Sequence, residues 1–229
     1  MKIGVVIAME KEFLRVRDLI TDYSTITINN KPFTTGKLGN NTIVMATSGI
    51  GKVNAAMCSL EMINAFHPDV MVSTGVAGGA DVSLEVQQVV VAEQTCYHDV
   101  YCGSEVEYGQ VIGQPSRFEC AEQLVSKALA LKCGTTVRKG LIVTGDWFVD
   151  DREKMRSIIS HFPDAMAVDM ESAAIAHVCH TEGVPFVSFR IISDIPLKDD
   201  KAQMYFDFWE KIADNSFNVT KSFLESIEG

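Results

Sequence analysis

Four acidic residues stand close to the ends of runs rich in Val and Ile, where carboxyl groups can do acid–base chemistry. Glu12 follows the first such run and Asp194 ends the last. Asp169 and Glu171 stand at the end of another such run, which lies between the first and the last in the sequence. An apolar setting disfavours the charged form, so a carboxyl group there keeps its proton to higher pH and can serve as a general acid or base. The simpler interpretations are a charge at a helix N-terminus for Glu12 and a helix cap for Asp169 or Glu171.

One basic residue, Arg190, lies inside an apolar run. A buried guanidinium needs a carboxylate partner, which Glu171 or Glu12 could supply. His177 and His180 could share one face of a helix, as pairs of metal ligands do. That helix offers no third ligand at a suitable position, so we do not expect a metal site. The pattern favours acid–base chemistry by carboxyl groups.

Two glycine-rich segments, Thr47–Lys52 and Thr74–Gly79, follow apolar runs and are predicted to be loops. Their bare backbone amides could approach a small ligand, although ordinary tight turns explain them equally well. Neither segment has the spacing of a nucleotide-binding fingerprint. Trp147 and Phe148 directly follow the run Gly140–Thr144, where they could stack on a planar base or simply pack as a core or lid.

Short Val- and Ile-rich runs predict buried strands, and the segments between them predict helices. The predicted strands are Ile3–Met9, Thr42–Thr47, Val70–Thr74, Val86–Glu93, Gly140–Thr144, Ala165–Asp169 and Pro185–Ser193. The predicted helices are Lys11–Leu19, Lys52–Phe66, Glu119–Leu131, Asp151–Ile159, Glu171–Thr181 and about Ala202–Ile227. Thr25–Ile28 and Phe33–Leu38 predict a hairpin. This alternation is typical of an α/β fold with a mixed, mainly parallel sheet covered on both faces.

Open α/β sheets bind ligands at the carboxyl ends of their strands, where these acids, glycines and aromatic residues are predicted to lie.

The chain has 229 residues, 47% of them hydrophobic, which fits a single domain over residues 1–229. A net charge of -10 disfavours binding to nucleic acid or to an anionic membrane. The first apolar run is too short to span a bilayer. The six cysteines lack paired metal-ligand spacing and the N-terminus does not resemble a secretory signal, so we expect a cytoplasmic protein with reduced thiols.

Six motifs occur together: Ala8-Met9-Glu10-x-Glu12, Ser48-Gly49-Ile50-Gly51-Lys52-Val53, Thr74-Gly75-x-Ala77-Gly78-Gly79, Gly145-Asp146-x-Phe148, Val168-Asp169-Met170-Glu171 and Ile192-Ser193-Asp194. In this order they resemble the bacterial 5′-methylthioadenosine/S-adenosylhomocysteine nucleosidases. The resemblance implies an α/β, three-layer nucleoside phosphorylase-like fold with a mixed central sheet flanked by helices, and a homodimer. It also implies hydrolysis of the adenine–ribose bond of these two nucleosides, with 5′-deoxyadenosine as a further substrate, and no metal or organic cofactor.

The resemblance also implies roles for single residues. Glu12 is expected to be the general base that activates water, and Asp194 the acid that protonates adenine N7. Phe148 is expected to stack on adenine, and the backbone of Val149 to bind the purine edge. Glu171 is expected to bind the ribose hydroxyls. The other expected substrate-binding residues are Met9, Ile50, Val76, Ala77, Gly78, Asp169, Met170 on the ribose, Arg190, Ser193 and Phe206.

The chemistry of glycosides gives the two catalytic acids complementary tasks. The C–N bond breaks through an oxocarbenium-like state, and the purine leaving group needs a proton. An Asp with an ordinary pKa of about 3.9 donates poorly at neutral pH, so we expect burial to raise the pKa of Asp194, or a hydrogen bond to deliver its proton. A silent adenine-nucleoside sensor is another interpretation, but a binder gains little from keeping Glu12, Glu171 and Asp194 in apolar surroundings.

Two further enzymatic functions stay open at this point. Val76 replaces a frequent Ser and Asp169 a frequent Glu, and the segment Tyr101–Gln114 matches the family poorly. These departures allow a hydrolase of futalosine or of 6-amino-6-deoxyfutalosine. A purine nucleoside phosphorylase of the same fold is the second alternative, but the glycine segments Ser48–Lys52 and Thr74–Gly79 lack the arginines that usually bind phosphate there.

Overall fold

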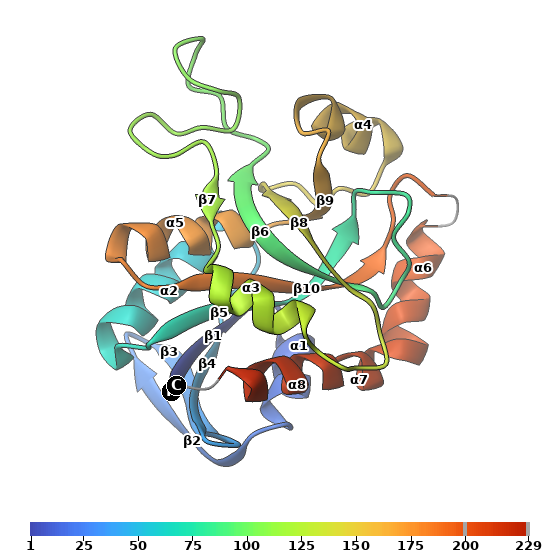
Figure 1. The fold of residues 1–229 in the computed structure, drawn as a ribbon. Coiled ribbons are helices and arrows are strands. Elements are labelled where there is room, and N and C mark those ends of the chain that lie inside the picture. The colour runs from blue at the N-terminus through green and yellow to red at the C-terminus, as the bar shows by residue number, and fades with distance from the viewer. Residues whose placement is uncertain (199–200, 228–229) are drawn as a thin grey trace.

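The structure, a computed structural model, describes residues 1–198 and 201–227 (Figure 1). Its strands are β1 (Lys2–Ile7), β2 (Thr21–Ile28), β3 (Lys31–Leu38), β4 (Asn41–Thr47), β5 (Val70–Gly79), β6 (Val89–Tyr97), β7 (Phe118–Glu119), β8 (Val137–Thr144), β9 (Ala165–Asp169) and β10 (Phe186–Asp194). Its α-helices are α1 (Glu10–Arg17), α2 (Lys52–Phe66), α3 (Glu122–Leu129), α4 (Arg152–His161), α5 (Ser172–Glu182), α6 (Lys201–Asp207), α7 (Ala213–Ser216) and α8 (Asn218–Ser226). A π-helix, η1 (Phe208–Ile212), separates α6 from α7.

The ten strands form one sheet, and five of them close into a ring. The order β10-β6-β8-β9-β5 closes because β10 also pairs with β5. From β5 the sheet continues outward through β1, β4, β3 and β2, with the hairpin β2–β3 at the edge. Within the described residues, five strand pairs are parallel and five are antiparallel. The sheet is mixed as predicted, and the parallel pairs are on the whole the longer ones, so most of the residue pairing is parallel, as expected.

Helices cover both faces of the sheet, as an α/β fold requires. The connection from β1 to β4 contains α1, and the connection from β4 to β5 contains α2. β4 and β5 flank β1 on opposite sides, and crossovers between parallel strands are almost always right-handed, so α1 and α2 are expected on opposite faces. α5 packs against α2. α5 ends at Glu182, one residue beyond the predicted Thr181, where Gly183 takes a left-handed conformation with φ of 70°.

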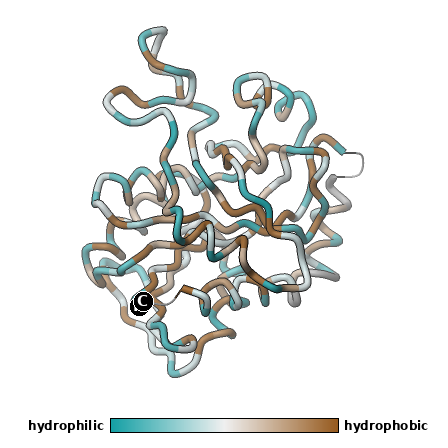
Figure 2. The backbone as a smooth tube through the Cα atoms, viewed as in Figure 1, coloured by the Kyte–Doolittle hydropathy of each residue, from teal (hydrophilic) through white to brown (hydrophobic). Residues whose placement is uncertain are grey.

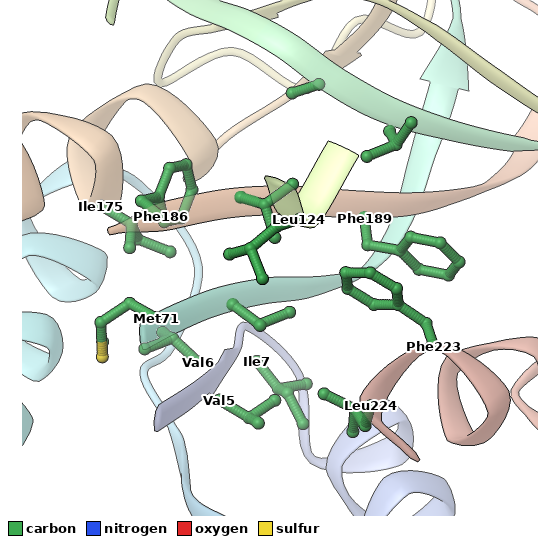
Figure 3. Packing of buried hydrophobic residues seen from close by; sticks show 14 of the residues in the cluster. Val5, Val6, Ile7, Met71, Leu124, Ile175, Phe186, Phe189, Phe223 and Leu224 are labelled. Atoms are coloured by element: carbon green, nitrogen blue, oxygen red, sulfur yellow. The ribbon is translucent and has the colours of Figure 1, made fainter. Parts of the chain in front are cut away.

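The hydrophobic core lies between the sheet and its helices (Figure 3). Phe189 of β10 stacks on Phe223 of α8 with ring centroids 4.5 Å apart and rings nearly parallel. Hydrophobic positions run through the central strands, whereas hydrophilic positions dominate many outer loops (Figure 2). Burial of such apolar surface is the main force that holds the strand ends, and therefore the site, in place.

Several predicted strands and helices have other bounds than expected. The strand predicted at Val70–Thr74 runs on to Gly79, because its glycines pair with β10 and then with β9 after β1 has ended. The prediction of a loop at Thr74–Gly79 is therefore wrong. The strand predicted at Val86–Glu93 is shifted to Val89–Tyr97. The terminal helix predicted from about Ala202 to Ile227 is divided among α6, η1, α7 and α8.

Candidate active site

One cavity of about 140 Å³ lies at the carboxyl ends of β1, β5, β8, β9 and β10. Every site residue predicted from the sequence lines it except Phe206. The predicted residues on its wall are Met9, Glu12, Ile50, Val76, Ala77, Gly78, Phe148, Val149, Asp169, Met170, Glu171, Arg190, Ser193 and Asp194. Ala8, Trp147, Val168 and Tyr205 complete the lining.

The aromatic residue from α6 on the cavity wall is Tyr205 and not Phe206. Phe206 is 61% exposed, whereas Tyr205 lies edge-on to Phe148 with ring centroids 6.0 Å apart. The sequence offered both aromatic residues side by side, and only the rotation of the helix decides which of them faces inward. Trp147, which the sequence left open between stacking and packing, also lines the cavity and is half exposed.

Glu12 is buried at the start of α1, and each of its carboxylate oxygens accepts a backbone N–H. Oε2 accepts from Met9 at 3.1 Å, and Oε1 accepts from Val76 at 2.8 Å. The first bond lies within the first turn of α1, where the simpler interpretation expected a charge, and the second joins α1 to β5. Burial raises the pKa of Glu12, while these two amides and Arg190 oppose the rise. Glu12 is thus a buried carboxyl group suited to take up a proton.

Gly75 makes room for Glu12 beside Arg190. β1 ends where Ile7 pairs with Thr74, so the next amides of β5 have no partner strand on that side. The side chain of Glu12 fills this gap and binds the amide of Val76. A Cβ atom on Gly75 would lie 2.8 Å from Glu12 Oε1 and 3.0 Å from Arg190 Nη1, and its φ of 142° also favours glycine.

Arg190 is buried on β10 and pairs with two acids. Its Nε lies 2.9 Å from Asp169 Oδ2, and its Nη2 lies 3.5 Å from Glu171 Oε2. Nη2 also donates to Ser73 Oγ at 2.8 Å. The sequence predicted a carboxylate partner but named Glu171 or Glu12, so it missed Asp169, the closest partner. Glu12 interacts with Arg190 through the electric field of the guanidinium, which opposes the rise of its pKa.

Glu171 is the predicted ribose ligand, and it contacts the N-terminus of α2. Its Oε1 accepts the amide of Gly51 at 3.0 Å. Burial raises the pKa of Glu171 to about 7, Arg190 lowers it, and Asp169 raises it. Asp169 in turn accepts from Thr144 Oγ1 at 2.6 Å and from the amide of Ser172. A network of buried hydrogen bonds therefore fixes the acids on this wall.

Asp194 lies at the end of β10, where the pairing with β5 is irregular. The register shifts between Ile192 and Asp194, and Asp194 pairs with Gly78 on the cavity wall. Its Oδ1 accepts from Ser193 Oγ at 2.7 Å. Such an irregularity redirects the side chains of a strand. The expected pKa shift of Asp194 stays a prediction.

The loop after β8 brings Phe148 and Val149 to the cavity and is held at its start by Asp146. Asp146 Oδ1 accepts the amide of Lys52 at 2.8 Å, and the amide of Asp146 donates to Asp99 Oδ2 at 2.8 Å. Lys52 Nζ binds the same Asp99 carboxylate at 2.7 Å. These contacts join the loop, the end of β6 and the start of α2, so they restrict where Phe148 can lie.

Two carboxylates already occupy the N-terminus of α2. Glu171 accepts from the amide of Gly51, and Asp146 accepts from the amide of Lys52. A free helix N-terminus attracts an anion, whereas one that binds two acids repels it. Within the described part of the chain, four acids line the cavity but only one basic residue, Arg190, does so. The cavity is therefore suited to a neutral ligand or to one that develops positive charge.

The described residues contain no group of three or more His, Cys, Asp and Glu side chains placed to hold a metal ion. His177, one of the two histidines considered above, lies with Nδ1 3.0 Å from the hydroxyl of Tyr97 and stacks on Phe118.

No described helix has the length and apolar character needed to cross a membrane.

The chain is similar over its whole length to known proteins. Residues 2–225 match the family model of the phosphorylase superfamily. A 5′-methylthioadenosine/S-adenosylhomocysteine nucleosidase of Exiguobacterium is 40% identical over 233 residues, covering 100% of this chain and 99% of the relative. Among solved structures, such a nucleosidase of Colwellia psychrerythraea in complex with adenine has a TM-score of 0.92 at 35% identity, covering 100% of this chain and 96% of that one.

A third similarity is to a different hydrolase. A futalosine hydrolase mutant of Helicobacter pylori has a TM-score of 0.90 at 30% identity, covering 99% of this chain and all of that one. The curated relative has the higher identity, and both the fold and the family resemblance expected from the motifs are confirmed. The chain belongs to the phosphorylase superfamily and, within it, to the family of the 5′-methylthioadenosine/S-adenosylhomocysteine nucleosidases.

Proposed function

We propose that this protein hydrolyses the N-glycosidic bond of 5′-methylthioadenosine and S-adenosylhomocysteine, releasing adenine and the thio-substituted ribose, and that it also accepts 5′-deoxyadenosine. Relatives that share at least 38% of their residues with it over nearly the whole chain are named for the first two nucleosides. The observation that carries the proposal is the meeting of Glu12 and Asp194, from distant parts of the sequence, in one cavity with an aromatic wall.

Glu12 takes the role of general base. It removes a proton from a water molecule as the water oxygen forms a bond to C1′ of the ribose. Its raised pKa supports this role, because a base whose pKa lies closer to the working pH accepts a proton more readily. The other acids of the cavity favour the positive charge that develops on the sugar as the C–N bond breaks.

Asp194 takes the role of general acid. It gives a proton to adenine N7, so the C–N electron pair leaves on a neutral base. Phe148 stacks on the purine, the backbone of Val149 binds the purine edge, and Glu171 accepts hydrogen bonds from the ribose hydroxyls. The geometry that supports these roles is the position of all four residues on the cavity wall.

Hydrolysis is favoured over phosphorolysis by the charges of the site. Phosphorolysis requires a phosphate ion next to C1′. Glu12 occupies the free amide of Val76, and Glu171 and Asp146 occupy the N-terminus of α2. Arg190 is committed to two carboxylates. A dianion would therefore meet acids at these three backbone amides.

The test is adenine release from 5′-methylthioadenosine by the wild-type protein and by Glu12→Gln and Asp194→Asn variants. We expect either substitution to lower kcat by about 10²- to 10⁴-fold, the usual contribution of a general acid or base. Glu10→Gln is the matched control, because Glu10 lies exposed on the same helix turn. Wild-type kcat in both site variants would refute the assigned roles.

A futalosine-type nucleoside is the second candidate substrate. The similarity to the Helicobacter pylori enzyme favours it, although at lower identity than the curated nucleosidases. Val76, one of the departures from the family pattern noted in the sequence, lines the cavity and offers no side-chain hydroxyl. Values of kcat/KM on 5′-methylthioadenosine, S-adenosylhomocysteine, futalosine and 6-amino-6-deoxyfutalosine decide between the two. We expect the two thio-nucleosides to be preferred.

The homodimer implied by the family is also part of the proposal. Ile50, Val53, Met57 and Leu60 form an exposed apolar stripe at the start and along the outer face of α2. The loops between β6 and β7 project from the body and expose Tyr101 and Ile112 (Figure 1). An apolar stripe beside a projecting loop is typical of a protein interface, here with a second copy of the chain.

Sedimentation of Met57→Glu tests the dimer. We expect the wild-type protein to sediment as a dimer and this variant as a monomer, since a charge on the stripe opposes its burial. Leu129→Glu on α3 is the control, with a similarly exposed apolar side chain. A monomeric wild-type protein would refute the proposal.

A cytoplasmic location completes the proposal. All six cysteines are free, and four of them are buried. Free thiols are typical of proteins in a reducing compartment. Cell fractionation with an antibody against the protein is the test, and recovery in the membrane or extracellular fraction would contradict it.

A further inference from the structure

The residue before the proposed base, Lys11, connects α1 to the aromatic wall of the cavity. Lys11 Nζ donates to the hydroxyl of Tyr205 at 3.2 Å. The same ammonium lies 3.6 Å from the centroid of the Trp209 ring. A cation over an aromatic face is attracted by its negative potential, most strongly for Trp. Lys11 therefore contacts two aromatic residues, four positions apart, of the C-terminal helical region.

Tyr205 is the member of this cluster that reaches the site. It lines the cavity, and its ring lies edge-on to Phe148 at a centroid distance of 6.0 Å. It also lies edge-on to Trp209 at 6.2 Å. A continuous chain of contacts therefore runs from Lys11 through Trp209 and Tyr205 to the ring expected to stack on the purine.

Trp209 and its neighbour Phe208 lie in the π-helix η1 and face different ways, as consecutive residues of any helix do. Phe208 is completely buried in the core, whereas the Trp209 ring lies over Lys11. Arg15, one turn after Lys11 on α1, adds a second cation 5.4 Å from the Trp209 ring. π-helical turns are rare and are frequently found at functional sites. Two cations of α1 therefore contact Trp209 of the π-helix, which in turn contacts Tyr205 on the cavity wall.

We propose that Lys11 is a positioning residue for nucleoside binding: its ammonium holds Tyr205 in place through the Tyr205 hydroxyl and the Trp209 ring. Lys11 does not line the cavity, and its charge is the smallest of the influences that lower the pKa of Glu12, so we expect its main effect on binding. The inference rests on the proposed nucleosidase function. Two neighbouring residues of α1 then have different roles. Glu12 is the general base, and Lys11 holds the aromatic wall of the cavity in place.

The test compares Lys11→Met with Lys11→Arg. Met keeps an unbranched side chain and removes the charge, whereas Arg keeps a cation that can stack on Trp209. We expect Lys11→Met to raise KM for 5′-methylthioadenosine by about threefold to tenfold, with kcat changed by less than about twofold, because the contact acts on binding. We expect Lys11→Arg to restore most of the wild-type KM.

Arg17→Met is the matched control, since Arg17 also lies on α1 and rests on an aromatic ring, Tyr23, outside the cavity lining. Its KM should equal the wild-type value. A double-mutant cycle with Tyr205→Phe, which removes only the hydroxyl, tests the route. If Lys11 acts through Tyr205, the double variant has about the same KM as Lys11→Met alone.

Adenine affinity, measured by calorimetry on the same variants, distinguishes a failure of the role of Lys11 from a failure of the proposed nucleosidase function. A wild-type protein that hydrolyses the nucleoside, together with a Lys11→Met variant of unchanged KM and adenine affinity, overturns the role of Lys11 alone. Effects of Lys11→Met and Tyr205→Phe that simply multiply also overturn it. A wild-type protein that neither binds adenine nor cleaves any of the nucleosides overturns the proposed function, and this role with it.

Discussion

Replacing Arg190 with Met tests whether the ion pairs on the cavity wall hold the site together. The side chains of Arg190 and Asp169 are each 2% exposed, and Glu171 shares the guanidinium. Met keeps much of the volume but leaves two buried carboxylates without a counter-charge. Breaking a buried pair from one side costs about 3–5 kcal/mol. Each kcal/mol lowers Tm by about 2–4 °C in a chain of this length, so we expect a loss of about 6–20 °C at about pH 8.

The loss of Tm in Arg190→Met should shrink as the pH falls. Burial already raises the pKa of Glu171 to about 7, and Arg190 opposes that rise. Without Arg190 the folded-state pKa rises further above the ordinary value of 4.5. A carboxyl group with a raised folded-state pKa favours folding below its unfolded-state pKa, and this contribution is lost as the pH rises through the folded-state value. The Tm deficit is therefore larger at about pH 8 than at about pH 5.

Thermal unfolding followed by circular dichroism at several pH values measures both effects. Arg117→Met is the matched control, since Arg117 Nη1 lies 2.6 Å from Asp164 but the two side chains are 32% and 54% exposed. An exposed pair contributes at most about 1 kcal/mol. Equal Tm losses for the two variants, or a deficit in Arg190→Met that grows as the pH falls, would refute the reasoning.

Three further substitutions test other contacts of the site. Gly75→Ala should lower kcat by at least about tenfold in steady-state assays, because a Cβ there displaces Glu12. Gly134→Ala, where the space around the Cβ is open, is the control and should keep the wild-type kcat. Thr144→Val should lower the free energy of unfolding in urea by about 1–3 kcal/mol, because it removes a hydrogen bond to buried Asp169, whereas Thr144→Ser should not. Phe148→Ala should weaken adenine binding by about 1–3 kcal/mol in calorimetry, the usual value of one stacking contact, and unchanged affinity would exclude stacking.

The positions of the acids could be predicted from the sequence because each stands at or shortly after the carboxyl end of a strand. Glu12, Glu171 and Asp194 needed only the rule that parallel strands bring their carboxyl ends together. The motif order then supplied the family, which the comparisons confirm. Their proposed catalytic roles rest on that resemblance and on the shared cavity, and they stay predictions until the variants are assayed.

Features that depend on long-range pairing could not be predicted. Asp169 is the closest partner of Arg190 because β9 and β10 both pair with β5, a result of the closed ring and not of local spacing. The choice of Tyr205 over Phe206 depends on the rotation of α6 and on the π-turn after it, which no simple periodicity contains. The sequence predicts a loop for the glycines after Thr74 because the local sequence does not reveal their pairing with β10.

The most direct test of hydrolysis is the identity of the sugar product formed from 5′-methylthioadenosine in the presence of abundant phosphate. Mass spectrometry of the reaction distinguishes free 5-methylthioribose from its 1-phosphate. We predict adenine and free 5-methylthioribose, formed at the same rate with and without phosphate, because acids occupy the backbone donors that phosphate would need. Formation of the sugar 1-phosphate, or adenine release only when phosphate is present, would contradict the account and identify a phosphorylase.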